Sequence, residues 1–176
     1  MTIEDKVKSI IRDIPDFPKP GILFKDITPI MQDFRLCAEI IEDLKIRIKP
    51  LNIEGVAGIE SRGFLIGLPL AIALEVPFIL IRKKGKLPYK TISHSYDLEY
   101  GSAVIEMQID DIKAGQRILI HDDLLATGGS ASAAAELIKK QNGIVAGFNF
   151  LVELSFLNGK SIISNYSQNI STLVRY

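Results

Sequence analysis

The 176-residue sequence has little cysteine, no net charge and no long apolar run. Cys37 is its one cysteine, which excludes an internal disulfide framework and fits a reducing compartment such as the cytoplasm. The 21 basic and 21 acidic residues cancel, whereas general binders of nucleic acids or anionic membranes carry excess basic charge. No apolar run approaches the roughly 20 residues needed to span a bilayer. We therefore expect a cytoplasmic globular protein without a nucleic-acid or membrane partner.

Two common nucleotide-binding motifs are also absent. The phosphate-binding motif G-x-x-x-x-G-K-[ST] does not occur, and the segment of closest spacing, "GIESRGFL" at 58–65, lacks the lysine. The dinucleotide-binding motif G-x-G-x-x-G does not occur either. These absences disfavour a P-loop enzyme and a dinucleotide-binding fold.

Helical and strand patterns alternate along the chain. Short apolar segments typical of strands lie at 55–59, 76–84, 117–123 and 143–154, and segments typical of helices lie at 60–75 and 130–141. Residues 102–110 alternate apolar and polar side chains, which indicates an antiparallel or edge strand. This order predicts an α/β fold, with an open, mainly parallel twisted sheet flanked by helices in one domain over residues 1–176.

Two additions to this sheet are expected. An N-terminal extension covers about residues 1–35, where isoleucines and a valine at helical spacing predict a helix that runs through Ile14, with Thr2 and Asp5 as a capping box. Asp33 is placed to cap the next helix, which carries Cys37. The second addition is a long polar segment at about 82–101, whose length without a regular pattern is typical of a flexible lid.

The segment "HDDLLATGGS" at 121–130 indicates a binding site. Asp122 and Asp123 follow a buried strand, at the sheet edge where open parallel sheets bind ligands. The turn that follows, at 127–130, combines hydroxyls, two glycines and a helix N-terminus, all of which suit a phosphate. The carboxylates suit sugar hydroxyls, directly or through a hydrated divalent ion. The residues thus predict a ribose 5-phosphate site; a plain glycine loop with an acidic helix cap stays open as an alternative.

The same segment resembles the phosphoribosyl diphosphate signature of the type I phosphoribosyltransferases. Four further blocks match the adenine-specific branch of that family in order along nearly the whole chain: "PDFPKPGILFKDITP", "GIESRGFLIG", "LIRKKGKLP" and "SYDLEYG". The resemblance implies a pentosyltransferase of purine salvage. It transfers the phosphoribosyl group from phosphoribosyl diphosphate to adenine and releases AMP and pyrophosphate, with Mg²⁺ bound through substrate and water rather than directly by the protein.

The resemblance assigns the phosphoribosyl and diphosphate contacts residue by residue. Asp122 and Asp123 contact the ribose hydroxyls, and the 5-phosphate is bound by Ala126, Thr127, Gly128, Gly129 and Ser130. The diphosphate is expected to contact Ser61, Arg62, Arg82, Lys83 and Lys86. The peptide between Glu60 and Ser61 is expected to be cis.

The polar segment at 82–101 is, by the same resemblance, a catalytic hood that closes over the reacting carbon and excludes water. Glu99 is expected to hold the proton of the purine imidazole nitrogen, and Tyr100 to order the closed lid. Glu99 and Arg62 are thus the expected catalytic residues.

The early loop is expected to select the base. The main chain of Leu23 and Lys25 would hydrogen-bond the edge of adenine, while Phe24 and Leu124 would enclose its ring. Two alternatives remain: a transferase for hypoxanthine, guanine or xanthine, and a non-catalytic regulator that senses phosphoribosyl diphosphate. The family resemblance also implies a homodimer. His121 departs from the family pattern, and we expect it to face a helix layer or a subunit contact rather than the site.

Overall fold

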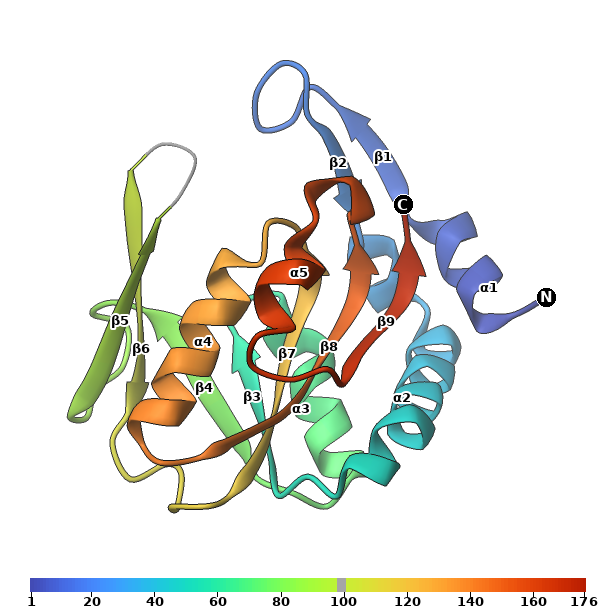
Figure 1. Cartoon of the computed structure of the whole chain (residues 1–176). Coiled ribbons are helices and arrows are strands. Elements are labelled where there is room, and N and C mark those ends of the chain that lie inside the picture. The colour runs from blue at the N-terminus through green and yellow to red at the C-terminus, as the bar shows by residue number, and fades with distance from the viewer. Residues whose placement is uncertain (98–100) are drawn as a thin grey trace. The chain divides into compact units, whose positions relative to one another are not determined.

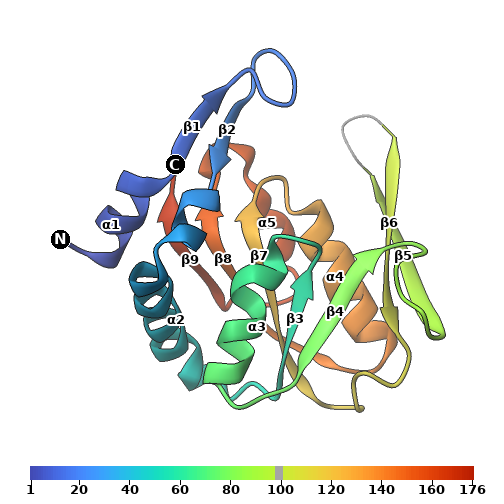
Figure 2. The same cartoon turned by 180° about the vertical axis from the view of Figure 1, so that it is seen from behind.

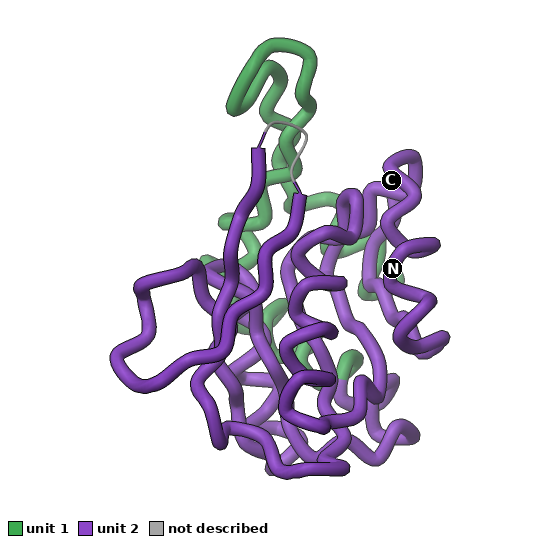
Figure 3. Tube along the Cα trace, turned by 60° about the vertical axis from the view of Figure 1, so that its left-hand side comes forward, with its two compact units in different colours: residues 1–44 green, residues 45–176 purple. Residues whose placement is uncertain are grey.

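The computed structural model describes residues 1–97 and 101–176, and the chain divides into two compact units (Figure 3). Residues 1–44 form the first unit and residues 45–176 the second. Helix α2 (Phe34–Ile48) begins in the first and ends in the second. The single domain over residues 1–176 stays a prediction. Among the described residues, no helix has both the length and the apolar character that a membrane span requires.

Short elements make up most of the first unit. They are α1 (Ile3–Ile10), β1 (Arg12–Pro15), β2 (Leu23–Asp26) and a 3-10 helix (Thr28–Gln32). The capping box of Thr2 and Asp5 at the start of α1 is confirmed. Asp33 is confirmed as a cap of α2, because its carboxylate accepts hydrogen bonds from the backbone N–H groups of Arg35 and Leu36 at 3.1 and 3.0 Å.

The predicted N-terminal helix is wrong beyond Ile10. Ile11 has an extended backbone, and β1 pairs antiparallel with β2 instead of continuing the helix. An ion pair of 2.7 Å between Arg12 and Asp26 joins the two strands. Isoleucine occurs in strands as well as in helices, so the spacing of these isoleucines fits either structure. The pairing of β1 with β2 selects the strand.

The second unit is built on a seven-stranded sheet with the strand order β5-β6-β4-β3-β7-β8-β9. In chain order the strands are β3 (Gly55–Ile59), β4 (Phe78–Lys83), β5 (Thr91–Asp97), β6 (Ser102–Gln108), β7 (Arg117–Leu125), β8 (Ile144–Glu153) and β9 (Ile170–Arg175). Strands β4, β3, β7, β8 and β9 are parallel, and β6 pairs antiparallel with both β4 and β5. The predicted α/β class and the antiparallel strand near residues 102–110 are confirmed.

Helices cover both faces of this sheet (Figures 1 and 2). Helices α4 (Gly129–Lys140) and α5 (Gly159–Ile163) lie on one face, and α3 (Gly63–Ala73) lies on the other. The alanines of α4, such as Ala134, are buried and allow the helix to pack closely on the sheet. The largest buried side chains, Phe148 and Phe150, come from β8 and are stacked with their centroids 6.5 Å apart.

The expected irregular lid is wrong over residues 91–97, which form strand β5. This strand pairs with β6 along its whole length, from Thr91 opposite Gln108 to Asp97 opposite Ser102. Its half-buried side chains alternate with exposed ones, because successive residues of a strand point to opposite faces. The polar composition of the segment concealed this two-residue period.

Candidate active site

The carboxyl end of β7 carries the acidic pair. This strand runs through the middle of the sheet, so Asp122 and Asp123 are buried, with exposed fractions of 9% and 5%. Asp123 accepts an ion pair from Arg62 at 2.9 Å, and its backbone N–H donates to the Asp122 carboxylate at 2.9 Å. The structure therefore brings together three residues to which the sequence analysis assigned two separate functions, ribose binding and diphosphate binding.

Burial controls the charge of these carboxyl groups. It raises the pKa of Asp122 well above the ordinary value, and the negative charge of Asp123 raises this pKa further, while Arg62 opposes both effects. Burial also raises the pKa of Asp123, against the lowering effect of Arg62. The pair is thus costly to ionise without a ligand, and a group that donates hydrogen bonds would favour its charged form.

The turn after the acidic pair leads into α4 and forms one side of a cavity of about 290 Å³. Gly128 has a φ of +86°, a left-handed conformation that glycine adopts without strain. No side chain of the described chain caps α4, so the N–H groups of its first turn are available to an anion. The cavity is lined by residues 124–131 together with Tyr96 and Asp97 of β5. All five predicted 5-phosphate residues, 126–130, line it.

A second backbone segment supports this turn. Gly159, the first residue of α5, lies so close that a Cβ atom built on it would overlap the carbonyl oxygen of Ala126 and come within 2.9 Å of the Gly128 nitrogen. Two glycines, Gly128 and Gly159, therefore allow the main chains of the turn and of α5 to touch. The sequence interpretation missed Gly159, because no local pattern connects it with a turn about 30 residues earlier.

A neighbouring cavity of about 250 Å³, called here the cationic cavity, is lined by Arg62 and Lys83 and also by the carboxylates of Glu60, Asp122 and Asp123. It shares Tyr96, Leu124, Ala126 and Ser130 with the first cavity. The predicted diphosphate residues Arg62 and Lys83 are thus brought to the acidic pair. The remaining three, Ser61, Arg82 and Lys86, are absent from the described lining of this cavity.

The first of those diphosphate candidates, Ser61, follows a peptide bond that is cis, as the resemblance implied. Arg82 donates to the Glu60 carboxylate at 3.0 Å and to the Lys86 carbonyl at 3.3 Å. Glu60 also accepts the backbone N–H of Lys83 at 2.8 Å. The carboxylate of Glu60 therefore fixes the end of β4, a function that the sequence interpretation missed.

The predicted base-binding residues of the first unit lie on β2. This strand pairs with β1 in a two-stranded sheet, so one of its edges has no strand partner among the described residues. Unpaired main-chain groups on such an edge can bind a ligand. Leu23 is half-exposed, Phe24 stacks edge-to-face with Phe17 at 5.1 Å, and Lys25 forms an ion pair of 2.6 Å with Asp13.

Leu124, the fourth predicted adenine contact, belongs to the second unit. It is half-buried and lines both cavities there. Glu99 and Tyr100 lie outside the described residues. The strands on either side of them, β5 and β6, end with Asp97 opposite Ser102.

His121 is fully buried on the α3 side of the sheet. Its Nδ1 atom is 2.8 Å from the Asn149 side-chain oxygen, and its Cδ2 atom would lie 3.2 Å from a Cβ built on Gly67 of α3. Burial lowers its pKa to about 4, so the ring is neutral at physiological pH. The expectation that His121 faces a helix layer is confirmed.

Comparisons with known proteins agree with this geometry. The sequence model of the phosphoribosyl transferase domain matches residues 25–153. The adenine phosphoribosyltransferase of Cytophaga hutchinsonii is 49% identical over 174 residues, which cover 99% of this chain and 96% of the relative.

Solved structures are similar over the whole chain. The crystal structure of adenine phosphoribosyltransferase from Thermoanaerobacter pseudethanolicus has a TM-score of 0.95 at 44% identity and covers 99% of this chain and 100% of its own. The Saccharomyces cerevisiae adenine phosphoribosyltransferase, complexed with an imino-altritol bisphosphate and adenine, has a TM-score of 0.91 at 39% identity, with 97% and 98% coverage.

Proposed function

The chain belongs to the phosphoribosyl transferase family, and from this membership we propose how its own residues act on their substrates. It transfers the phosphoribosyl group from phosphoribosyl diphosphate to adenine and gives AMP and pyrophosphate, a pentosyl transfer of purine salvage. The observation that carries this assignment is a pair of adjoining cavities at the end of β7, the second of which is lined by the acidic pair. One contains a phosphate-binding turn and the other contains cations, which matches a sugar with a phosphate at one end and a diphosphate at the other.

We assign the 5-phosphate to the turn at residues 126–130. Its support is the backbone N–H groups at the start of α4, which carry the positive end of the helix dipole and belong to residues that line the first cavity. The carboxylates of Asp122 and Asp123 then accept hydrogen bonds from the ribose hydroxyls. Those hydroxyls supply the donors that favour the charged form of the buried pair.

We assign the diphosphate to the cationic cavity. Arg62 and Lys83 supply positive charge for the leaving group as the bond to the anomeric carbon breaks, and Ser61, Arg82 and Lys86 are assigned to the same group. Asp123 orients Arg62 through its ion pair. An arginine held in this way has less side-chain freedom to lose when the diphosphate binds.

Mg²⁺ is proposed as the cofactor, bound by substrate oxygens and water. In the described chain no group of three or more potential metal ligands gathers, but two adjacent buried carboxylates, Asp122 and Asp123, fit an ion that keeps most of its waters. When bound, Mg²⁺ would neutralise charge on the diphosphate. The protein's contribution is to orient the substrate and its hydration shell through these two carboxylates.

Glu99 is proposed to hold the proton on the imidazole nitrogen of adenine while the other nitrogen of that ring attacks the anomeric carbon. Tyr100 and the hood at residues 82–101 are proposed to exclude water from an oxocarbenium-like centre. Main-chain groups of Leu23 and Lys25 are proposed to hydrogen-bond the adenine edge. Phe24 and Leu124 are proposed to enclose its ring.

A homodimer is proposed, and α3 supports it. Leu65, Leu68 and Ile72 are 46%, 46% and 69% exposed, and their spacing places them on one face of the helix. An apolar stripe of this kind is typical of a surface that a partner covers. Cytoplasmic location is also proposed, on the grounds that the single cysteine, Cys37, permits no internal disulfide.

The proposed function is tested by incubating the protein with phosphoribosyl diphosphate, Mg²⁺ and one purine base at a time. Of the purine bases, only adenine should give a nucleotide product, namely AMP together with an equal amount of pyrophosphate. Asp123→Asn should lower kcat/KM roughly 10²-fold, since hydrogen bonds to charged groups contribute about 1.5–3 kcal/mol each. The same exchange at Asp111, in the exposed turn between β6 and β7, is the matched control and should leave kcat/KM unchanged.

Other outcomes would redirect the assignment. Product from hypoxanthine, guanine or xanthine but not from adenine would overturn the base specificity while keeping the transferase. Tight binding of phosphoribosyl diphosphate without product from any base would instead indicate the sensing regulator.

A further inference from the structure

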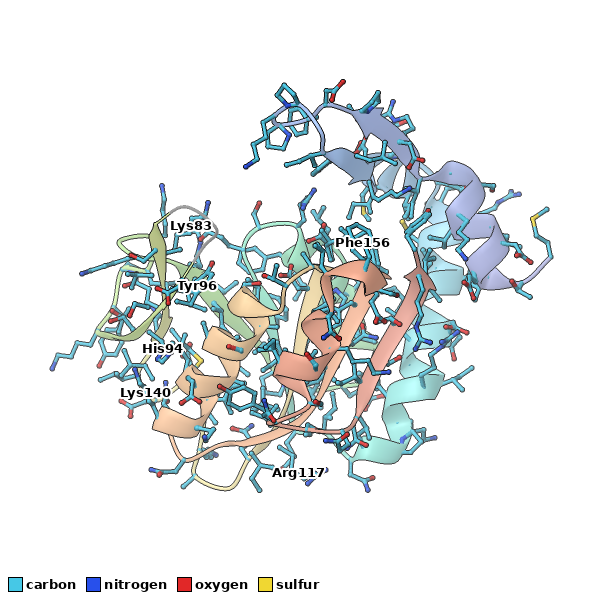
Figure 4. All side chains as sticks on the ribbon, turned by 45° about the horizontal axis from the view of Figure 1, so that its top comes forward. Lys83, His94, Tyr96, Arg117, Lys140 and Phe156 are labelled. Carbon is cyan, nitrogen blue, oxygen red and sulfur yellow. The ribbon has the colours of Figure 1, made fainter. Side chains whose placement is uncertain are left out.

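Tyr96 lies where the two cavities meet. Its side chain comes from β5, the strand at the edge of the sheet, and it lines both the phosphate cavity and the cationic cavity. Figure 4 shows it beside Lys83 and at the opposite end of β5 from Lys140. The wall that faces the phosphate-binding turn is therefore formed by a residue to which neither the sequence patterns nor the family match assigned a role.

The ring of Tyr96 is held against the start of α4. A Cβ atom built on Gly129 would lie 3.3 Å from the Cδ2 atom of this ring, and the backbone oxygen of Asp97 lies 3.7 Å from the same position. At the other end of α4, Lys140 donates a hydrogen bond of 2.7 Å to the Ser93 carbonyl oxygen. Strand β5 is thus fixed to α4 at both ends, which places the Tyr96 ring over the first turn of the helix.

The hydroxyl of Tyr96 is available to a ligand. Within residues 1–97 and 101–176 it makes no hydrogen bond, although the ring is half-buried and packs against the hydrophobic core. Burial raises the pKa of Tyr96, and the negative charge of Asp122 raises it further, so the hydroxyl keeps its proton at neutral pH. A protonated phenol beside an anion-binding turn is a hydrogen-bond donor without a protein acceptor.

We propose that Tyr96 is a substrate-binding residue whose hydroxyl donates a hydrogen bond to the 5-phosphate, while its ring covers that phosphate opposite the turn at residues 126–130. The inference rests on the proposed function, because it assumes that the turn binds the 5-phosphate. The main-chain N–H groups of the turn then bind the phosphate from the helix side, and Tyr96 binds it from the strand side.

The test separates the hydroxyl from the ring. Tyr96→Phe keeps the ring and its packing, so its thermal melting temperature should equal that of the wild type. Its Kd for ribose 5-phosphate, measured by calorimetry, should rise about tenfold, the effect of losing one hydrogen bond to a charged group. The Kd for inorganic pyrophosphate should stay unchanged, because the proposal directs the Tyr96 hydroxyl to the 5-phosphate and not to the diphosphate.

Two further measurements identify the atom that is contacted. The phosphorus NMR resonance of bound ribose 5-phosphate should differ between the wild type and Tyr96→Phe, since the phosphate loses a donor. In steady state the KM for phosphoribosyl diphosphate should rise with kcat unchanged. Tyr96→Leu, which also removes the ring, should bind ribose 5-phosphate more weakly than Tyr96→Phe does.

The matched control is Tyr166→Phe. Tyr166 is a second tyrosine that is not exposed, and its hydroxyl donates to Glu136 of α4 at 2.7 Å, outside both cavities. Removing it should leave both Kd values unchanged. The proposal is overturned if Tyr96→Phe binds ribose 5-phosphate as tightly as the wild type, or if its phosphorus resonance is the same.

Failure of this inference can be distinguished from failure of the proposed function. Wild-type protein that forms AMP while Tyr96→Phe shows normal Kd and KM values would reject the role of Tyr96 alone. Wild-type protein that forms no AMP would reject the proposed function. The ribose 5-phosphate titration and its phosphorus resonance would still decide the role of Tyr96.

Discussion

The end of β7 and the strand β5 contribute to the same two cavities but differ in how they are held. Strand β7 lies inside the sheet between β3 and β8, and Asp122 and Asp123 are buried there. Strand β5 lies at the sheet edge, pairs with β6 alone, and has no fully buried residue. One side of the site is therefore part of the protein core, and the other is a surface strand.

This difference has a chemical reason. Groups that bind the phosphoribosyl moiety must be in position before the substrate arrives, and a packed core fixes them at no further entropic cost. A lid has to move to admit the substrate, and segments that move are found where few apolar contacts hold the chain. The buried carboxylates of β7 thus belong to the preorganised part of the site, and the hood assigned to the segment after β5 belongs to the part that closes. Tyr96 of β5, whose ring packs against the start of α4, joins the two parts. Four predictions test this division.

The largest effect is expected for the chemistry assigned to the segment after β5. Glu99→Gln keeps the side-chain size and removes the charge, so kcat should fall about 10²–10⁴-fold, as expected for the loss of a positioned proton acceptor. Binding of phosphoribosyl diphosphate, measured by calorimetry, should be unchanged. A variant with the kcat of the wild type would remove Glu99 from the mechanism.

The second prediction compares packing in the two regions. Phe150 is fully buried on β8 beside β7. The substitution Phe150→Ala should lower the unfolding free energy by about 3–5 kcal/mol, because it removes buried apolar surface and leaves a cavity. Ile92 of β5 is half-buried, so Ile92→Ala should cost about 1–2 kcal/mol. Urea denaturation measures both values. Equal costs would contradict the claim that the two sides of the site are packed differently.

The third prediction concerns the contact between Gly159 and the phosphate-binding turn. Helix propensity alone would make Gly159→Ala stabilising by about 0.5–1 kcal/mol. The added Cβ meets Ala126 and Gly128, so we expect instead a loss of about 1–3 kcal/mol in unfolding free energy and a raised KM for phosphoribosyl diphosphate. Lys160→Ala, one residue further along α5, is the control and should change neither. A stabilised Gly159→Ala protein with normal KM would refute the contact.

The smallest effect is a stability gain from Asp122→Asn. In the folded protein the pKa of Asp122 is raised above its ordinary value of 3.8, so the folded state binds more protons than the unfolded state as pH rises above that value. Stability therefore falls with rising pH over this range, and at neutral pH the asparagine variant should be more stable than the wild type. The difference should vanish only well below pH 3.8, where the carboxyl is protonated in both states.

Thermal unfolding across the pH range measures this gain, and the same variant should lose transferase activity. An Asp122→Asn protein that is less stable at pH 7 would show that the ionised carboxyl stabilises the fold, contrary to the burial argument. Gain of stability with loss of activity would show that the buried acid serves substrate binding.

The alternation of helices and strands, the acidic pair and the glycine turn were all predictable, because each is a pattern of neighbouring residues. Asp122, Asp123 and residues 126–130 form one continuous segment, and the phosphate-binding character of a turn before a helix follows from its local backbone groups. The capping residues Thr2 and Asp33 were predictable for the same reason. Their hydrogen bonds reach only two or three residues along the chain.

Tertiary structure decided what depends on residues far apart in the sequence. The ion pair of Arg62 with Asp123, the pairing of β5 with β6 and the contact of Gly159 with Ala126 each join separate segments. Polar composition concealed β5, and the isoleucine spacing near residue 11 was compatible with two structures. Local chemistry thus determined which groups could bind a phosphorylated sugar. Only the fold determined which of these groups lie in contact. The reason is that strand pairing and side-chain burial depend on residues from the whole chain, not on a local segment.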